Sequence, residues 1–195
     1  TSSTEETSST EETSSTEETT APEASVVDEI KLTVDSLGLP SQSYTSSTAT
    51  VDGVTFEFIQ LGNYGDGLQM RDKNGNTTTL WNVTEFDRPI ARIELVYSGT
   101  KDVTYANADA VIFTFGNAMG EATYTTKLST EAGVKTYTIT PDAETYTFFK
   151  LEHDLGYTFY WASITIVFAD EAEGGEDVTV PEETSSTEET SSTEE

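Results

Sequence analysis

The clearest signal of fold class lies in residues 52–58, which read Asp-Gly-Val-Thr-Phe-Glu-Phe. After the turn-forming Asp-Gly pair, apolar residues at positions 54, 56 and 58 alternate with polar residues at positions 55 and 57. Successive side chains of a strand point to opposite faces, so this alternation is typical of a strand with one buried face. The segment therefore predicts a half-buried β-strand that begins directly after a tight turn.

The same alternation of apolar and polar residues recurs in further segments along the middle of the chain, and turn-forming dipeptides separate these segments. The further alternating segments are 92–97, 111–115, 137–139, 149–151 and 164–168. Only residues 34–39 hint at a helical turn. Many short strands without helical crossovers predict an all-β fold, an antiparallel β-sandwich that we expect to be of jelly-roll type.

The two ends of the chain have a different composition. The hexapeptide Thr-Ser-Ser-Thr-Glu-Glu occurs three times in residues 1–18 and twice in residues 184–195. Such segments cannot bury enough apolar surface to offset their ordering entropy, so we expect disordered linkers over residues 1–25 and 171–195. The β-sandwich binding module should then occupy residues 26–170. Because the chain starts within a linker, we expect it to be part of a larger protein with other modules.

The charge of the chain excludes several classes of partner. Nine Lys and Arg residues stand against 36 Asp and Glu residues, for a formal net charge of -27. Binding to nucleic acid requires a basic surface, and no basic stripe occurs. No apolar run approaches the roughly 20 residues that span a bilayer, which predicts no membrane insertion. We therefore expect neither nucleic acid nor membrane as a partner. We also expect the protein to be a monomer.

Residues with catalytic chemistry are scarce. The chain has no cysteine and one histidine, His153, which we expect to pack in the core. This excludes a thiolate nucleophile and any site built on several histidines. The acids sit singly on the polar sides of strands, as Glu57 and Glu94 do, so we assign no catalytic residue and predict a protein that is not an enzyme. We expect no cofactor, although so acidic a domain is compatible with a structural calcium ion whose ligands the sequence does not reveal.

Several short motifs together resemble a known group of modules. They are Leu37-Gly38-Leu39, Ser43-Tyr44, residues 52–56, residues 68–71, Trp81-Asn82 with Phe86, and Tyr160-Trp161 before Ile164 and Ile166. This set resembles the β-sandwich modules of multidomain surface proteins from gut bacteria. The Thr/Glu spacers resemble those of clostridial, Ruminococcus-like systems that degrade fibre and starch. The resemblance implies a carbohydrate-binding type of module, located outside the cell and attached to its surface.

A site for sugar needs an aromatic face and planar polar side chains, and the segment around Asn74 offers both. A three-residue loop at residues 73–75 would pair Gln69 with Thr79 and Arg71 with Thr77, and would place Trp81 outward beside Gln69 and Arg71. A two-residue loop at Asn74-Gly75 would instead turn Trp81 into the core. Both readings are open at this stage. Asn82, next to Trp81, is a further candidate.

Two other segments contribute candidate residues. Tyr64 stands among small polar residues in positions 62–67, which is typical of an exposed functional loop and equally compatible with a packed loop tip. Tyr160 and Trp161 precede the last alternating segment and could form one wall of a cleft, although aromatic residues at such positions more often plug the end of a sandwich. The segment 72–76 has oxygens at alternating positions, but its glycine is misplaced for a calcium loop and a turn is favoured.

These observations support two functions. The first is a non-catalytic module that binds a neutral polysaccharide by aromatic stacking, with avidity between tethered copies. Among neutral glycans the spacers favour starch or another α-glucan. The alternative is a structural or adhesive bead of a surface stalk that has no glycan ligand, and it predicts no concave aromatic cleft.

Overall fold

The computed structural model describes residues 28–65, 67–72, 75–100, 110–143, 145–153 and 158–170. The expected linkers over residues 1–25 and 171–195 lie outside the described residues. Within the described part, the chain forms eleven strands. They are β1 (Glu29–Leu32), β2 (Ser43–Val51), β3 (Val54–Asn63), β4 (Leu68–Met70), β5 (Thr78–Asn82), β6 (Ile90–Tyr97), β7 (Val111–Gly116), β8 (Tyr124–Lys127), β9 (Thr136–Ile139), β10 (Phe148–His153) and β11 (Phe159–Phe168).

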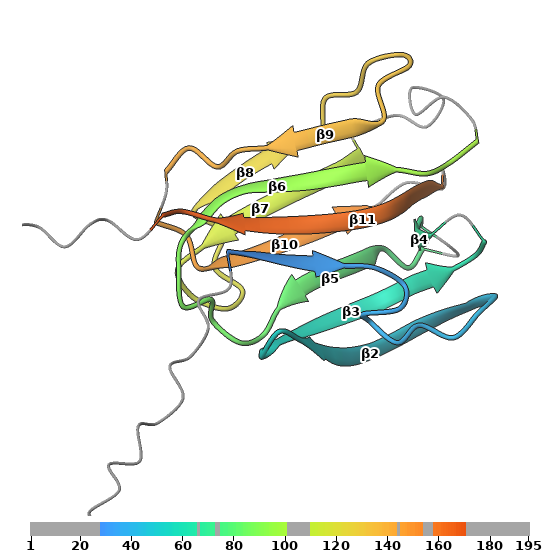
Figure 1. The fold of residues 1–195 in the computed structure, drawn as a ribbon, viewed down its shortest axis with the longest axis horizontal. Helices are drawn as coiled ribbons and strands as arrows, with labels where there is room; N and C mark the ends of the chain where they lie inside the picture. The colour runs from blue at the N-terminus through green and yellow to red at the C-terminus, as the bar shows by residue number, and fades with distance from the viewer. Residues whose placement is uncertain are drawn as a thin grey trace, which may run out of the picture.

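The strands form two antiparallel layers, with β6 and β11 in front of β7 and β10 (Figure 1). The larger layer has the order β2-β3-β5-β10-β7-β8. In the smaller layer β11 pairs with β6 on one edge and with both β1 and β4 on the other, and β9 follows β6. The short strand β4 also pairs with β3, so it joins the two layers at one corner.

The fold class predicted from the alternating pattern is confirmed. Each alternating segment forms a strand, and the chain passes between the layers at every connection from β8 to β11, as a jelly roll requires. The Asp52-Gly53 pair makes a two-residue turn with φ values of 49° and 82°, which joins β2 to β3. Residues 34–38 form the expected turn, closed by a hydrogen bond from Leu39 N to Val34 O of 2.9 Å.

The core lies between the layers and is built from the inward residues of both. Phe56 and Phe58 of β3 are buried there, as their alternation predicts. His153 is fully buried and its ring meets that of Phe159 at a centroid distance of 5.1 Å, so its predicted role in packing is confirmed. Burying this continuous apolar surface is the main driving force that holds the two layers together.

The hairpin predicted around Asn74 is wrong in both of its registers. Strand β4 pairs with β3 along one edge and with β11 along the other, so neither edge is left for β5. The turn at Gly65 joins β3 to β4, so Tyr64 lies at the connection of that hairpin. Thr78 Oγ1 accepts a hydrogen bond from Arg71 N and donates one to Arg71 O, which holds the start of β5 beside the end of β4.

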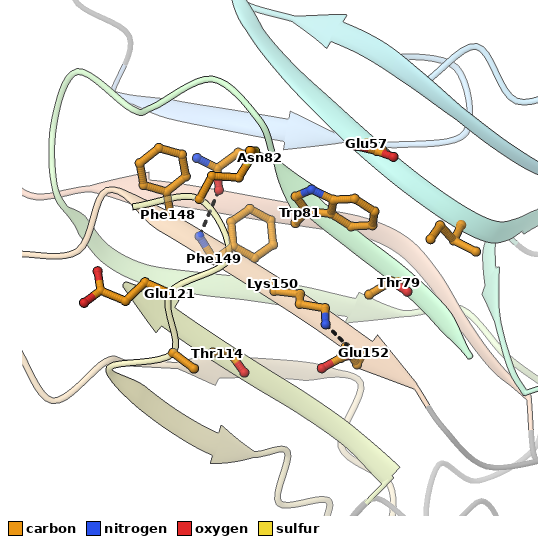
Figure 2. Close-up of a pocket in the computed structure, with 14 residues that line it drawn as sticks. Glu57, Thr79, Trp81, Asn82, Thr114, Glu121, Phe148, Phe149, Lys150 and Glu152 are labelled. Atoms are coloured by element: carbon orange, nitrogen blue, oxygen red, sulfur yellow. Dashed lines mark hydrogen bonds and ion pairs between the residues drawn. The ribbon is translucent and has the colours of Figure 1, made fainter. Parts of the chain in front are cut away.

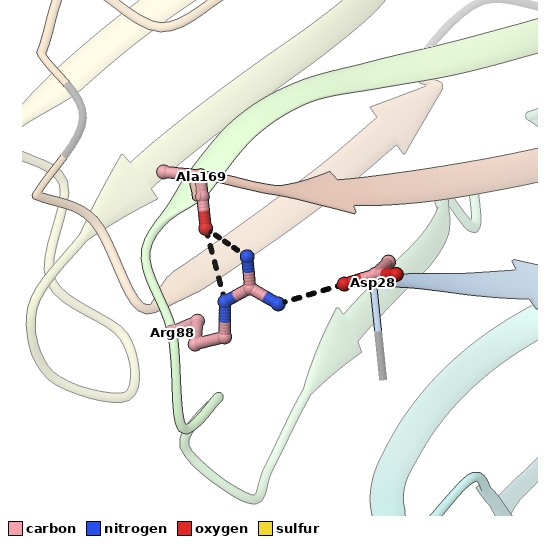
Figure 3. Close-up of polar contacts among 3 residues, drawn as sticks. All are labelled: Asp28, Arg88 and Ala169. Carbon is pink, nitrogen blue, oxygen red and sulfur yellow. Dashed lines mark hydrogen bonds and ion pairs between the residues drawn. The ribbon is translucent and has the colours of Figure 1, made fainter. Parts of the chain in front are cut away.

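The two ends of the described domain lie together (Figure 3). Phe168 N donates a hydrogen bond of 3.1 Å to Asp28 O. The Arg88 guanidinium donates from Nε and Nη2 to Ala169 O, and from Nη1 to Asp28 Oδ1 at 3.1 Å. One side chain therefore ties the entry of β1 to the exit of β11.

Candidate functional site

Trp81 lies on the outer face of the larger layer, with its side chain half-buried. Its neighbour Leu80 is fully buried in the core, which fixes the parity of β5 and places Trp81 on the opposite face. The strand register puts Glu57 of β3 directly opposite Trp81 on one side and Lys150 of β10 on the other. A carboxylate, an indole and an ammonium group therefore follow one another across three adjacent strands.

A groove of about 500 Å³ surrounds this row (Figure 2). Its floor continues to Thr114 of β7, which lies opposite Lys150. Phe148 and Glu121 lie on one side of the row, and Thr79 and Glu152 lie on the other (Figure 2). The described lining residues are Glu57, Ile59, Thr79, Trp81, Asn82, Thr114, residues 119–122, residues 148–150 and Glu152.

The groove also gathers exposed apolar surface. Among the described residues, the large apolar side chains with the greatest exposure are Met119 at 59%, Ile59 at 40% and Val96 at 37%. Met119 and Ile59 both line the groove. The groove therefore has exposed apolar side chains as well as charged ones.

One wall of the groove is the connection between β7 and β8. Glu121 N donates a hydrogen bond to Ala118 O, and Glu121 Oε2 accepts one from Asn117 N, each at 3.0 Å. A Cβ atom on Gly116 would lie 2.8 Å from Glu121 O, so the loop can approach the end of β7 only because this residue is glycine. The Glu121 carboxylate thus holds the wall in place.

The carboxylates that line the groove differ in whether they have partners within the protein. Lys150 Nζ lies 2.7 Å from Glu152 Oε1, in an ion pair on one strand face. The Glu121 carboxylate is engaged by its own loop. Glu57 flanks the indole of Trp81. Two of the three carboxylates therefore already have partners within the protein.

Asn82 does not serve as a free amide in the groove. Its Nδ2 donates to Thr84 O at 2.9 Å and to Thr147 O at 3.0 Å, and its Oδ1 accepts from Phe149 N at 2.8 Å. The residue is 1% exposed. Its hydrogen bonds connect β5 to the start of β10, so its role is to position the strands on which Trp81 and Lys150 lie.

Gln69 and Arg71 are not beside Trp81, contrary to the expected hairpin. Gly62, which pairs with Gln69, is five residues from Glu57 along β3, roughly 15 Å of strand. Gln69 Nε2 donates to Tyr160 Oη at 2.6 Å, and Tyr44 Oη donates to Gln69 Oε1. The hairpin prediction fails because the pairing of β4 with β3 and β11 moves Gln69 and Arg71 to the corner where the layers join.

At this corner four of the predicted residues do meet, around a tyrosine that sequence reasoning did not select. The Arg71 guanidinium lies 4.7 Å over the ring of Tyr44, and the ring of Tyr64 lies 5.0 Å from it. A Cβ atom on Gly62 would lie 2.9 Å from Tyr44 Cε1, so the ring occupies space that only glycine leaves open. Burial raises the pKa of Tyr44 to about 12, and the charge of Arg71 opposes that effect. Hydrogen bonds and ring contacts join these side chains, although Arg71 Nε is buried without a hydrogen-bond partner among the described residues.

Trp161 is a core residue and cannot form a wall of a cleft. It is fully buried, stacks on Phe159 at 5.5 Å and meets the edge of Tyr97 at 5.8 Å. The competing expectation, that aromatic residues here plug the sandwich, describes it correctly. Tyr160 points to the opposite face, where it accepts the hydrogen bond from Gln69.

Sequence reasoning missed Lys150, Phe148 and the 119–122 wall. The sequence contained only part of the information needed to find them. Lys150 and Phe148 alternate with the buried residues 149 and 151, so they could be assigned to an outer face, but no local pattern says which strand lies beside them.

In the ranges that the structure describes, no three His, Cys, Asp or Glu side chains gather into a possible metal site. Among the same residues, no helix is long and apolar enough to cross a bilayer.

The fold and the groove define a β-sandwich module with an aromatic site on the outer face of one sheet. No family model matches the chain, and no curated protein matches it either. Among solved structures it is similar to CBM86, described as a low affinity xylan binding module from the gut symbiont Roseburia intestinalis. The identity is 13% and the TM-score 0.36, and the match covers 72% of this chain and 96% of that one.

Proposed function

We propose that this domain is a non-catalytic module that binds a neutral polysaccharide in the groove around Trp81. The observation that carries the proposal is the row of Glu57, Trp81 and Lys150 across three strands. A sugar ring can stack on the indole while its hydroxyl groups donate to the carboxylate and accept from the ammonium group. Aromatic and polar side chains converge in this way in small-molecule sites.

The contacts of the acids support binding without catalysis. Glycoside hydrolysis usually requires two carboxyl groups that flank the scissile bond, one as an acid and the other as a base or nucleophile. In the groove Glu152 is paired with Lys150, and Glu121 accepts the hydrogen bond that shapes the wall. Among the described lining residues, the other two carboxylates are thus engaged within the protein, which leaves no second carboxylate to act together with Glu57.

The charges of the groove support a neutral ligand. Three carboxylates line it together with the ammonium group of Lys150, and that ammonium group is already paired. An anionic polysaccharide would meet a negative field from both the groove and the acidic chain as a whole. A choice of α-glucan among neutral glycans rests on the spacers alone. So does a location at the cell surface, where tethered copies of a weak site would bind an insoluble ligand by avidity.

Affinity electrophoresis tests this proposal. The protein is run in native gels that contain amylopectin, xylan, mannan or no polysaccharide, beside the Trp81→Ala variant. Retardation in one gel that Trp81→Ala abolishes supports a glycan-binding module and names the class of its ligand. Equal migration in all gels would refute the proposal and favour the structural or adhesive bead.

A further inference from the structure

We infer, on the basis of the proposed function, that the groove binds an internal stretch of a linear polysaccharide that runs across the strands, and not a chain end. The row that contains Trp81 continues over the whole larger layer. Its members, in register from β2 to β8, are Thr48, Glu57, Trp81, Lys150, Thr114 and Thr125.

The length of the row suits an extended chain. Five steps between neighbouring strands, at about 4.8 Å each, give a track of roughly 24 Å. Trp81 lies near its middle, so a ring stacked there would have further floor on both sides. The track crosses the strands at right angles, because it follows directly paired residues.

Both ends of the track are open in the described structure. The terminal members, Thr48 and Thr125, are exposed and small. A site for a chain end would need a wall across the track. The wall formed by Phe148 and the 119–122 loop instead lies alongside it, because Phe148 and Gly116 form the next rung on the same face (Figure 2). A chain can therefore enter at one edge of the layer and leave at the other.

Labels at the two ends of the track can test this arrangement. The chain has no cysteine, so Thr48→Cys and Thr125→Cys each create a unique position for an environment-sensitive fluorophore. Thr138→Cys provides a matched control, since Thr138 is exposed on β9 of the other layer. Each labelled protein is titrated with amylopectin and with xylan while tryptophan fluorescence is followed. We expect both track labels to respond with the midpoint of the tryptophan signal, and the Thr138 label to stay unchanged.

A second measurement uses partial hydrolysis, which raises the number of chain ends at constant mass of polysaccharide. If the groove binds internal stretches, the affinity per mass of polysaccharide should stay constant in the early stages of hydrolysis. It should then fall once the fragments are shorter than the track. An affinity per mass that rises with the number of ends, or a response from one track label alone, would overturn the inference. The proposed function fails separately, if neither polysaccharide changes the tryptophan signal and no gel retards the protein.

Discussion

Trp81 of β5 and Lys150 of β10 lie directly opposite each other on the outer face of the larger layer. Asn82 and Phe149, the next residues along the same strands, are joined by a buried hydrogen bond of 2.8 Å. The outward, half-buried pair is thus held in place by the buried pair beside it. This arrangement separates residues that should affect binding from residues that should affect stability.

Truncation of Trp81 should remove binding and leave the fold intact. Trp81→Ala deletes the proposed stacking face, and the loss of a central aromatic anchor typically costs about 2 kcal/mol or more, which is over tenfold in affinity. Affinity electrophoresis and thermal unfolding provide the two readouts. Val96→Ala is the control, because Val96 is an exposed apolar residue that does not line the groove. Equal loss of retardation in both variants would argue against a site at Trp81.

Substitution of Asn82 should lower the stability of the fold. Asn82→Ala leaves two carbonyl groups and one buried N–H without their partners, which we expect to cost about 3 kcal/mol and to lower Tm by roughly 6–12 °C. Thermal unfolding followed by circular dichroism measures the shift, and Thr138→Ala on an exposed strand position serves as the control. An unchanged Tm would show that the three hydrogen bonds do not support the fold.

The sequence predicted the strands and the buried faces well, because alternation is a local property that each segment carries by itself. Phe56 and Phe58, which the alternation predicts to be inward, are both buried. One of the two alternatives from the sequence turned Trp81 outward, and that orientation is correct although the hairpin on which it was based does not form. The alternation of inward and outward side chains within a strand can therefore be predicted correctly even when the partner strand is not.

Pairing between distant strands could not be predicted in the same way. The neighbours of Trp81 come from β3 and β10, and no local pattern connects those segments to β5. The Asn-Gly signal at residues 74–75 suggested that β4 pairs with β5, whereas β4 has its partners in β3 and β11. Gln69 and Arg71 were therefore expected beside Trp81, whereas the pairing of β4 with β3 and β11 places them at the corner with Tyr64 and Tyr160.

The tyrosine cluster predicts a pH dependence at high pH. The pKa of Tyr44 is raised from 10.0 to about 12, chiefly by burial, so the folded state keeps this proton when the unfolded state loses it. The resulting stability is fully present below pH 10 and is lost as the pH rises toward 12. The difference in tyrosinate absorbance between the wild type and Tyr44→Phe should titrate with a midpoint near 12. A midpoint near the ordinary value would contradict burial of this phenol.

Arg88 and Arg92 form a matched pair for a test of the terminal contacts. Arg88 bonds a backbone carbonyl at Ala169 and is largely buried, whereas Arg92 makes an exposed ion pair with Glu94. Arg88→Ala should cost about 1–2 kcal/mol and speed hydrogen exchange in β1, while Arg92→Ala should change stability by less than about 0.5 kcal/mol. Equal effects of the two substitutions would show that the tie between Asp28 and Ala169 carries no stability.

The closeness of Asp28 and Ala169 also has a mechanical consequence. Tension carried by flanking chain would enter the domain at one of these residues and leave at the other, across the Phe168 N to Asp28 O hydrogen bond. The β1 and β11 strands run antiparallel from this point. Such a load would therefore break their backbone pairs one after another, beginning at the end that Arg88 holds together. The rest of the sandwich, including the face that carries Trp81, lies outside the load path. A domain loaded in this way could keep the face that carries Trp81 folded while the flanking chain is under tension.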